Sequence, residues 1–196
     1  YTMRRVYAYL LKKRHIQREV LNAFVHVGLI YEDEKYHNAV FVGKDEHGVA
    51  RHAHKRSTHD TGKTFRINVE CSDPRCSFHW TGVSDRLYVF EGPIDLLSYI
   101  TLYPEDWQQH SYVACCGTSC LPVLWMLEHN PGLRDVSLCL DNDKAGHTAS
   151  LRLAERIAEQ FEIASSRLIP ENKDWNDDLT KLAEQDHAVQ MVQQMG

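Results

Sequence analysis

The stretch at residues 87–95, with the sequence LYVFEGPID, constrains the fold of this chain more than any other. Four apolar or aromatic residues run directly into an acid, a glycine and a proline. An apolar run of this kind, bounded by turn residues, is typical of a buried strand in a parallel sheet. Gly92 allows a sharp turn, and Pro93 suits the first turn of a helix, where a missing N–H group costs nothing. The pattern therefore predicts a strand, a turn and a helix, with Glu91 at the carboxyl end of a central strand.

The same alternation of strand and helix continues towards the C-terminus. Further strands are predicted at 112–116, 136–140 and 166–169, and helices at 93–103, 121–129 and 144–161. The final stretch is polar and mostly helical in pattern. Repeated strand–helix units favour an α/β fold, with a parallel sheet of about four strands and right-handed crossovers.

The residues before this series predict a small α+β unit. Residues 3–14 and 15–27 each carry an apolar stripe at helical spacing. Residues 38–81 change to the period of strands, and four strands in an antiparallel arrangement are expected there. A short polar link at 83–86 marks a boundary, so we expect two domains, 1–84 and 85–196.

Charge is distributed unevenly along the chain, although the net charge is −5. The first 66 residues are rich in Lys, Arg and His, and the last third is acidic. In the antiparallel unit we expect a polar, partly cationic face made by His52, His54, Lys55, Arg56 and His59. A solvated sheet face is the default interpretation of this pattern, and contact with phosphates is the alternative.

The composition excludes several classes of protein. With 43% hydrophobic and 25% charged residues, the 196-residue chain is globular and long enough to bury a core. No apolar run approaches the length of a membrane span, and no secretory signal is present, so no membrane partner is expected. Cys115 and Cys116 are adjacent, unlike a disulfide framework, which indicates the reducing cytoplasm. Because the chain starts at Tyr1 rather than Met, we expect it to be part of a longer protein.

Cys71, Cys76 and His79 combine residue types that bind zinc. Their spacing, Cys-x4-Cys-x2-His, is loose, and no second pair follows at zinc-finger spacing. His52 and His54 could complete the set only through tertiary folding. The incomplete pattern favours structural cysteines over a zinc site.

Acidic residues follow three of the predicted parallel strands. These residues are Glu91, then Asp141 and Asp143, then Asp174, Asp177 and Asp178. Each alone is explained by a cap, a turn or a salt bridge. Together they fall at the carboxyl edge of the sheet, where open α/β sheets bind ligands. Mg²⁺ prefers carboxylate oxygens combined with waters and substrate phosphates, so the pattern predicts a Mg²⁺ site, with Mn²⁺ as an alternative ion.

Four motifs resemble those of the Toprim domain in order and spacing. They are EGPID at 91–95, GTS at 117–119, DNDKAG at 141–146 and KDWND at 173–177. The similarity covers about residues 85–180 and is nearest to the DnaG-type, primase-like branch found in plasmid and conjugative-element proteins. The N-terminal half resembles, more weakly, the uncharacterised domain that often precedes Toprim in mobile-element proteins.

The resemblance implies roles for individual residues. It implies that Glu91 is a general acid/base in nucleotidyl transfer or strand cleavage. The implied catalytic residues are Glu91, Asp95 and Lys144. The implied metal ligands are Glu91, Asp141, Asp143, Asp174 and Asp177. The expected contacts to nucleic acid are Lys55, Arg56, Gly117, Thr118, Ser119, Lys144 and Lys173. The chain departs from the primase pattern at Trp175 and Asn176, where an acid is expected; Asn176 cannot supply the same charge, which counts against a second metal.

The resulting hypothesis is a Mg²⁺-dependent enzyme that acts on single-stranded DNA or RNA with nucleotides as substrates. Primer synthesis in the replication or transfer of a mobile element is the first expected reaction, and hydrolytic nicking is the second. The alternative is a non-catalytic module that recruits nucleic acid or a replication partner such as a helicase. Metal-dependent turnover that requires Glu91 would discriminate between enzyme and module.

Overall fold

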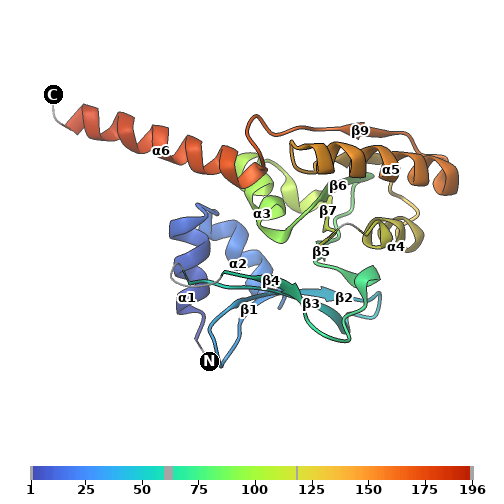
Figure 1. Ribbon diagram of the computed structural model, residues 1–196, viewed down its shortest axis with the longest axis horizontal. Helices are drawn as coiled ribbons and strands as arrows, with labels where there is room; N and C mark the ends of the chain where they lie inside the picture. The colour runs from blue at the N-terminus through green and yellow to red at the C-terminus, as the bar shows by residue number, and fades with distance from the viewer. Residues whose placement is uncertain (1, 60–63, 118, 195–196) are drawn as a thin grey trace.

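The computed structural model describes residues 2–59, 64–117 and 119–194. Two sheets lie one above the other, and helices flank each of them (Figure 1). The N-terminal sheet has the strand order β1-β2-β3-β4 and is antiparallel throughout. The second sheet has the order β5-β7-β6-β8-β9, in which β7, β6, β8 and β9 are parallel. The predicted fold class, a parallel sheet preceded by a small antiparallel unit, is confirmed.

The N-terminal unit begins with helical segments that precede its sheet. Its elements are α1 (Arg4–Tyr7), the π-helix η1 (Ala8–Lys13), α2 (Arg18–His26), β1 (Ile30–Glu32), β2 (Ala39–Lys44), β3 (Ala50–Arg56) and β4 (Arg66–Asn68). Gly28 has a φ of +70° directly after α2. A residue in this left-handed conformation is the usual end of a helix, and glycine adopts it without strain.

The C-terminal unit alternates strand and helix. Its elements are η2 (Pro74–Cys76), β5 (His79–Trp80), β6 (Arg86–Phe90), α3 (Pro93–Leu102), η3 (Trp107–Gln109), β7 (Ser111–Ala114), α4 (Leu121–His129), β8 (Asp135–Leu138), α5 (Lys144–Phe161), β9 (Ser165–Arg167) and α6 (Trp175–Gln194). α6 projects beyond the body of the molecule (Figure 1). None of the described helices is long and apolar enough to cross a membrane.

Three details of the antiparallel unit differ from the prediction. The strand expected at 76–82 is reduced to β5, and it pairs with β7 of the other sheet instead of with β4. β1 was not predicted as a strand. His52 and His54, expected on a polar face, are buried, with exposed fractions of 4% and 6%. Burial lowers the pKa of His52 to about 4, so this ring is neutral and contributes no charge to a cationic face.

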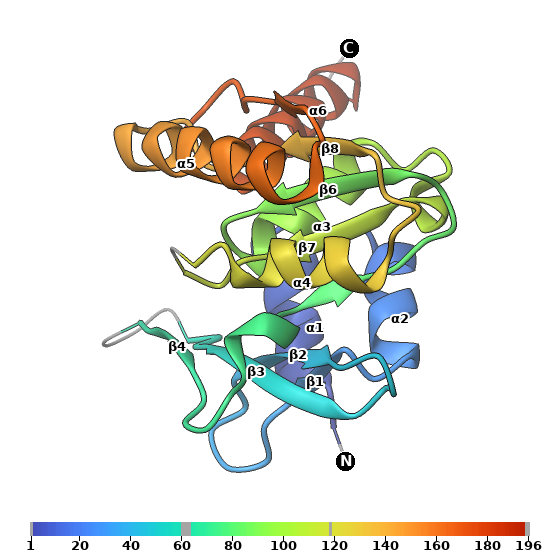
Figure 2. The same cartoon turned by 90° about the vertical axis from the view of Figure 1, so that its right-hand side faces the viewer.

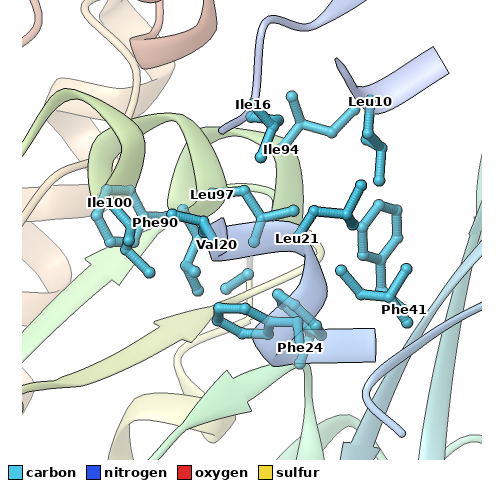
Figure 3. Close-up of a cluster of buried hydrophobic side chains, with 14 of the residues drawn as sticks. Leu10, Ile16, Val20, Leu21, Phe24, Phe41, Phe90, Ile94, Leu97 and Ile100 are labelled. Carbon is cyan, nitrogen blue, oxygen red and sulfur yellow. The ribbon is translucent and has the colours of Figure 1, made fainter. Parts of the chain in front are cut away.

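One hydrophobic core connects the two units. Figure 3 shows Val20, Leu21 and Phe24 of α2 packed among side chains from β2, β6 and α3. Phe24 is completely buried, and its ring lies 5.3 Å from that of Phe78 and 5.6 Å from that of Trp107. The core is therefore continuous across the link at 83–86, and burial of apolar surface fixes the two sheets relative to each other.

Removing the Phe24 ring tests this shared core. We expect Phe24→Ala to lower the free energy of unfolding by about 3–5 kcal/mol, because it leaves a large cavity at the junction. Chemical denaturation followed by tryptophan fluorescence and by far-UV circular dichroism gives the value. The matched variant Phe65→Ala removes an exposed ring and should cost less than about 1 kcal/mol. Two separate transitions, of which only one shifts, would contradict a continuous core.

Candidate active site

The turn after β6 places Glu91 at the carboxyl edge of the parallel sheet. Gly92 is the N-cap of α3 and Pro93 is its first residue, as the sequence predicts. The carbonyl of Glu91 accepts a hydrogen bond from the backbone N–H of Cys116, which holds the turn against the loop after β7. The Glu91 carboxylate lies 3.9 Å from Nη2 of Arg66 on β4. Glu91 therefore lies between the parallel sheet and the N-terminal unit.

The loop after β8 carries the Asp-x-Asp pair. Asp143 is the N-cap of α5, and its side chain accepts a hydrogen bond of 2.8 Å from the N–H of Gly146. A Cβ atom at position 146 would lie 2.1 Å from the carbonyl oxygen of Asp141, so only glycine allows this close approach. Arg167 of β9 donates to the same carbonyl oxygen at 2.9 Å. The pair is thus held by the backbone around it, and the Oδ1 atom of Asp141 is buried without a hydrogen-bond partner.

The loop before α6 brings Asp174 to the same edge. The N–H of Asn142 donates to the carbonyl of Lys173 at 2.8 Å, and the indole of Trp175 donates to the carbonyl of Cys139 at 2.8 Å. Asp174 Oδ1 accepts from the N–H of Asp177. These bonds connect the loop to the end of β8. The motif at 173–177 therefore lies beside the Asp-x-Asp pair, as expected from the parallel sheet.

Burial and mutual repulsion raise the pKa values of these acids. The pKa of Asp95 is well above its usual value, first because of burial and then because Asp174 and Asp141 lie nearby. The pKa of Asp141 rises to about 7 through burial and the charges of Glu91 and Asp174. Burial and Asp174 also raise the pKa of Asp177. The structure therefore brings the predicted acids together, and their charges are unfavourable without a cation.

The donor set fits a Mg²⁺ ion. Over the described ranges of the chain, no three His, Cys, Asp or Glu side chains are arranged to hold a metal ion by themselves. Mg²⁺ does not require such a cage, because it usually retains several waters and binds through one or two carboxylates and substrate phosphates. The unpartnered Asp141 Oδ1, surrounded by further carboxylates, is an oxygen ligand of this type. Asp143 and Asp174 each use one oxygen in a local hydrogen bond and retain the other.

Asn176 has a role that the sequence did not reveal. Its Nδ2 atom donates to the carbonyl of Arg14 and to Oγ of Ser98, each at 2.9 Å, and its Oδ1 accepts from Nη1 of Arg14 at 3.0 Å. The backbone N–H of Asn176 faces Oδ1 of Asp95 at 3.4 Å. The side chain is buried and uses both of its polar atoms. Where the primase pattern has an acid, this chain has a neutral group that connects α6 to α3 and to the N-terminal unit.

A cleft of about 280 Å³ lies between residues 91–95 and the N-terminal sheet. Glu91, Asp95 and Gly117 line one wall, and Arg56 and Arg66 line the other. The cleft thus has acidic groups on one side and guanidinium groups on the other, which is a suitable arrangement for a metal-bound phosphate.

Hydrogen bonds support both walls of this cleft. Nε atoms of Arg14 and Arg56 each donate to the hydroxyl of Tyr9 at 3.0 Å. Asn68 of β4 donates to the carbonyl of Cys116, whose own N–H donates to the carbonyl of Glu91. The sequence analysis missed Tyr9, Arg14 and Arg66 because each contacts a residue that is distant in the chain, namely Arg56, Asn176 and Glu91, respectively.

The predicted contacts to nucleic acid are distributed over several places. Arg56 and Gly117 line the cleft, and Ser119 and Lys144 line a neighbouring groove. Lys55 instead lies 3.9 Å from Asp33. Lys173 lies near the acids. Its positive charge lowers the pKa of Asp141, whereas burial and the neighbouring carboxylates raise it. Thr118 lies outside the described residues.

The fold is that of the catalytic core of DnaG-type primases. The chain is similar to the primase fragment of the bacteriophage T7 primase-helicase protein, with a TM-score of 0.65 and 18% identity, over 92% of this chain and 72% of that chain. It is also similar to the DnaG catalytic core, with a TM-score of 0.59 and 16% identity, over 96% of this chain and 73% of that one. At these identities, the similarity shows the fold alone.

Family models divide the chain in the same order as the sequence motifs. Residues 88–179 match the family described as Toprim-like, and residues 8–84 match the family described as a protein of unknown function, DUF3991. The chain therefore carries a Toprim-like domain preceded by a DUF3991 domain. It is 28% identical over 207 aligned residues to an uncharacterised Bacillus anthracis plasmid protein, pXO2-78. The alignment covers 90% of this chain and 57% of the length of that relative.

The raised pKa of Asp141 predicts how stability changes with pH. This pKa is about 7 in the folded chain against an ordinary value of 3.8, so the folded state binds the proton more tightly. The free energy of unfolding should therefore fall as the pH rises between these two values. In a chelating buffer above pH 7, Asp141→Asn should raise the melting temperature by about 2–4 °C, a modest gain because solvent screens part of the repulsion.

Calorimetric melting curves from pH 5 to pH 8 would measure this effect. The matched variant Asp186→Asn removes an exposed carboxylate of α6 and should follow the wild-type curve. If Asp141→Asn were less stable than the wild type at high pH, repulsion among the acids would not be the dominant effect at this position.

Proposed function

We propose that this chain is a Mg²⁺-dependent, primase-like enzyme that transfers nucleotidyl groups on single-stranded nucleic acid. The observation that carries the proposal is the cluster of acids with raised pKa values at the edge of the parallel sheet, beside a cleft in which Glu91 and Asp95 face two arginines. The primase-like fold and the Toprim-like match support it. Acids that repel one another in this way favour a bound divalent cation, and the facing guanidiniums favour phosphates.

In this proposal the residues of the cleft and of the neighbouring acidic loops have distinct tasks. Asp141, Asp143, Asp174 and Asp177, together with Glu91, would hold Mg²⁺. When bound, the ion would neutralise charge on the transferring phosphoryl group. Glu91 lies at the meeting point of the acids and Arg66, where its carboxylate can accept a proton from the attacking hydroxyl or return one. Asp95 remains protonated more readily than a free carboxyl and accepts a hydrogen bond from the backbone N–H of Asn176 in the first turn of α6.

Cations of the N-terminal unit would position the strand. Arg56 and Arg66 lie in the cleft itself. A second hollow of about 590 Å³ on the other side of Tyr9 is lined by Arg5, Lys12, Lys13 and His59. Tyr9 borders this hollow, and its hydroxyl accepts a hydrogen bond from Arg56. The two hollows together offer a row of positive charges that leads to the acids and could follow a phosphate backbone.

One observation favours a non-catalytic module as the second candidate. In the parts of the chain that the structure describes, no three ligand side chains enclose an ion, so the acids alone would bind metal weakly. Such a module would bind nucleic acid without forming a product. In either case we propose a role in the replication or transfer of a mobile element, beside a helicase, because one relative is a plasmid protein and one fold neighbour is the primase fragment of a primase-helicase protein.

Metal binding is the first measurement that separates these functions. Titration of Mn²⁺ into the protein, followed by calorimetry, should show saturable binding that Asp141→Asn/Asp143→Asn abolishes. Asparagine at position 143 can still cap α5, so the fold should persist. The charge-matched control Asp135→Asn/Asp186→Asn should bind Mn²⁺ like the wild type. Equal binding by all three proteins would place the metal elsewhere in the molecule.

Turnover then tests the role of Glu91. On a single-stranded template with labelled nucleotides and Mg²⁺ or Mn²⁺, Glu91→Gln should reduce product formation by about 10²-fold or more, as for loss of a general acid/base. Its melting temperature should stay close to that of the wild type. The exposed control Glu105→Gln should retain activity.

The products of this assay decide among the candidate functions. Strands longer than the nucleotide substrates indicate polymerisation, and shortened templates indicate hydrolytic nicking. Unchanged turnover in Glu91→Gln would show that this residue is not the acid/base. Strand binding by the wild type without any metal-dependent product would favour the non-catalytic module.

A further inference from the structure

A third hollow, which we call the α5 groove, also reaches Glu91. It has a volume of about 860 Å³ and is bounded by the loop after β7 and by one face of α5. α5 and α4 cover the same face of the parallel sheet, with α5 lying along the edge strands (Figure 2). Glu91 and Gly117 line both this groove and the Arg56–Arg66 cleft. The α5 groove and the Arg56–Arg66 cleft therefore meet at Glu91, the residue to which we assign proton transfer.

The α5 wall of this groove carries three cationic side chains, with two acids among and beyond them. Lys144, Arg152 and Arg156 line it at intervals of eight and four residues, which places them on one side of the helix. Their charged groups form no hydrogen bond or ion pair with any residue that the structure describes. Glu155 lies between the two arginines in sequence and Glu159 lies beyond them, whereas Lys144 and Arg152 come before both acids on α5. Cations that have no fixed partner favour an anionic ligand.

The floor of the groove is apolar. Cys115, Leu140, Ala149 and Leu153 contribute to it, whereas Ser119 and Thr148 supply hydroxyl groups along the sides. An apolar floor flanked by arginines and hydroxyl groups suits a ligand that has both a flat, weakly polar face and charged groups. Nucleotides are such ligands, because the base has flat faces and the phosphates are charged.

The length of the groove indicates a strand instead of a single nucleotide. Lys144 and Arg156 are separated by about 18 Å along the helix axis, at 1.5 Å per residue. A stacked strand rises about 3.4 Å per nucleotide, so the cations span several nucleotides. A phosphodiester that reacts at Glu91 within a strand has nucleotides on both sides of it, and Glu91 lines both the Arg56–Arg66 cleft and the α5 groove.

We propose that the α5 groove binds the single strand on the side of Glu91 opposite the Arg56–Arg66 cleft. Lys144, Arg152 and Arg156 contact its phosphates, and its bases lie on the apolar floor. Because the floor presents few groups that distinguish bases, this part of the interaction is independent of sequence. The inference rests on the proposed function, since it extends the path of the same nucleic-acid substrate.

The salt dependence of strand binding tests this path. The probe is a fluorescein-labelled oligodeoxythymidylate long enough to enter both hollows, and anisotropy gives its affinity for the full chain over a series of salt concentrations. Each neutralised phosphate of a single strand contributes about 0.7 to the slope of log K against log [salt]. We expect Arg152→Ala/Arg156→Ala to reduce the magnitude of this slope by about 1.4, corresponding to two lost phosphates.

Three matched variants interpret the result. Arg152→Lys/Arg156→Lys keeps both positive charges and should therefore keep the wild-type slope. A slope that falls in the alanine variant alone is then an effect of charge and not of altered structure. Arg18→Ala/Arg134→Ala removes two arginines that line neither hollow and should have no effect. Arg56→Ala/Arg66→Ala removes the cations of the cleft and should also reduce the slope. Circular dichroism verifies the fold of each variant.

Two outcomes would overturn the inference, and they differ in what they say about the proposed function. If Arg152→Ala/Arg156→Ala keeps the wild-type slope while Arg56→Ala/Arg66→Ala lowers it, the strand does not follow α5, although the proposed function stands. If the wild-type chain binds no strand at any salt concentration, the inference and the proposed function both fail. A reduced slope in both alanine variants, with the lysine variant unchanged, supports a path through both hollows.

Discussion

The packing of α2 against α3 is the interaction on which the arrangement of the molecule depends. Phe24 and its neighbours bury apolar surface from both sheets in one cluster, so neither unit has a complete core without the other. This packing places β4 opposite the turn after β6. The arginines of one unit and the carboxylates of the other consequently face each other across a cleft, although they belong to segments that match different family models.

Hydrogen bonds to backbone carbonyls, and not the charges of the carboxylates, stabilise the edge of the sheet that carries the acids. Carboxylates that raise one another's pKa values contribute unfavourably to folding at neutral pH. Local contacts in the surrounding structure offset this unfavourable contribution. Gly146 allows the loop after β8 to approach α5, and Arg167 donates a hydrogen bond to the carbonyl of Asp141. Trp175 donates a hydrogen bond to the carbonyl of Cys139 and so holds the loop before α6 in place. Electrostatic strain of this kind is common at functional sites and is relieved when a ligand binds.

The sequence predicted the parallel half of the fold closely because local signals there agree with the global structure. The helix from Lys144 to Phe161 was predicted with the observed bounds, since an aspartate cap and an apolar stripe specify it. The carboxyl-edge position of the acids followed from strand–helix alternation alone. In β6 and β7, apolar residues run into turn residues, so the hydrophobic pattern and the turn signals predict the same strand ends.

Other features could not be predicted because they depend on long-range contacts. The two residues of β5 are too short to show a period, and their partner β7 lies thirty or so residues away, in a different unit by the sequence boundary. His52 and His54 alternate with polar neighbours as on a solvated face, but packing on Asn68 and the second unit buries them. Asn176 was interpreted as a missing acid because its partners Arg14 and Ser98 are distant in sequence.

The hydrogen-bonded chain from Asn68 through Cys116 to Glu91 has a mechanical consequence. It connects β4 to the turn after β6 on one side of the cleft, and the aromatic cluster around Phe24 connects the two units on the other side. With attachments at both places, the units have no free hinge about which to rotate. The cleft is therefore pre-formed, and a substrate that enters it meets its contacts without a domain closure, which limits the conformational entropy lost on association.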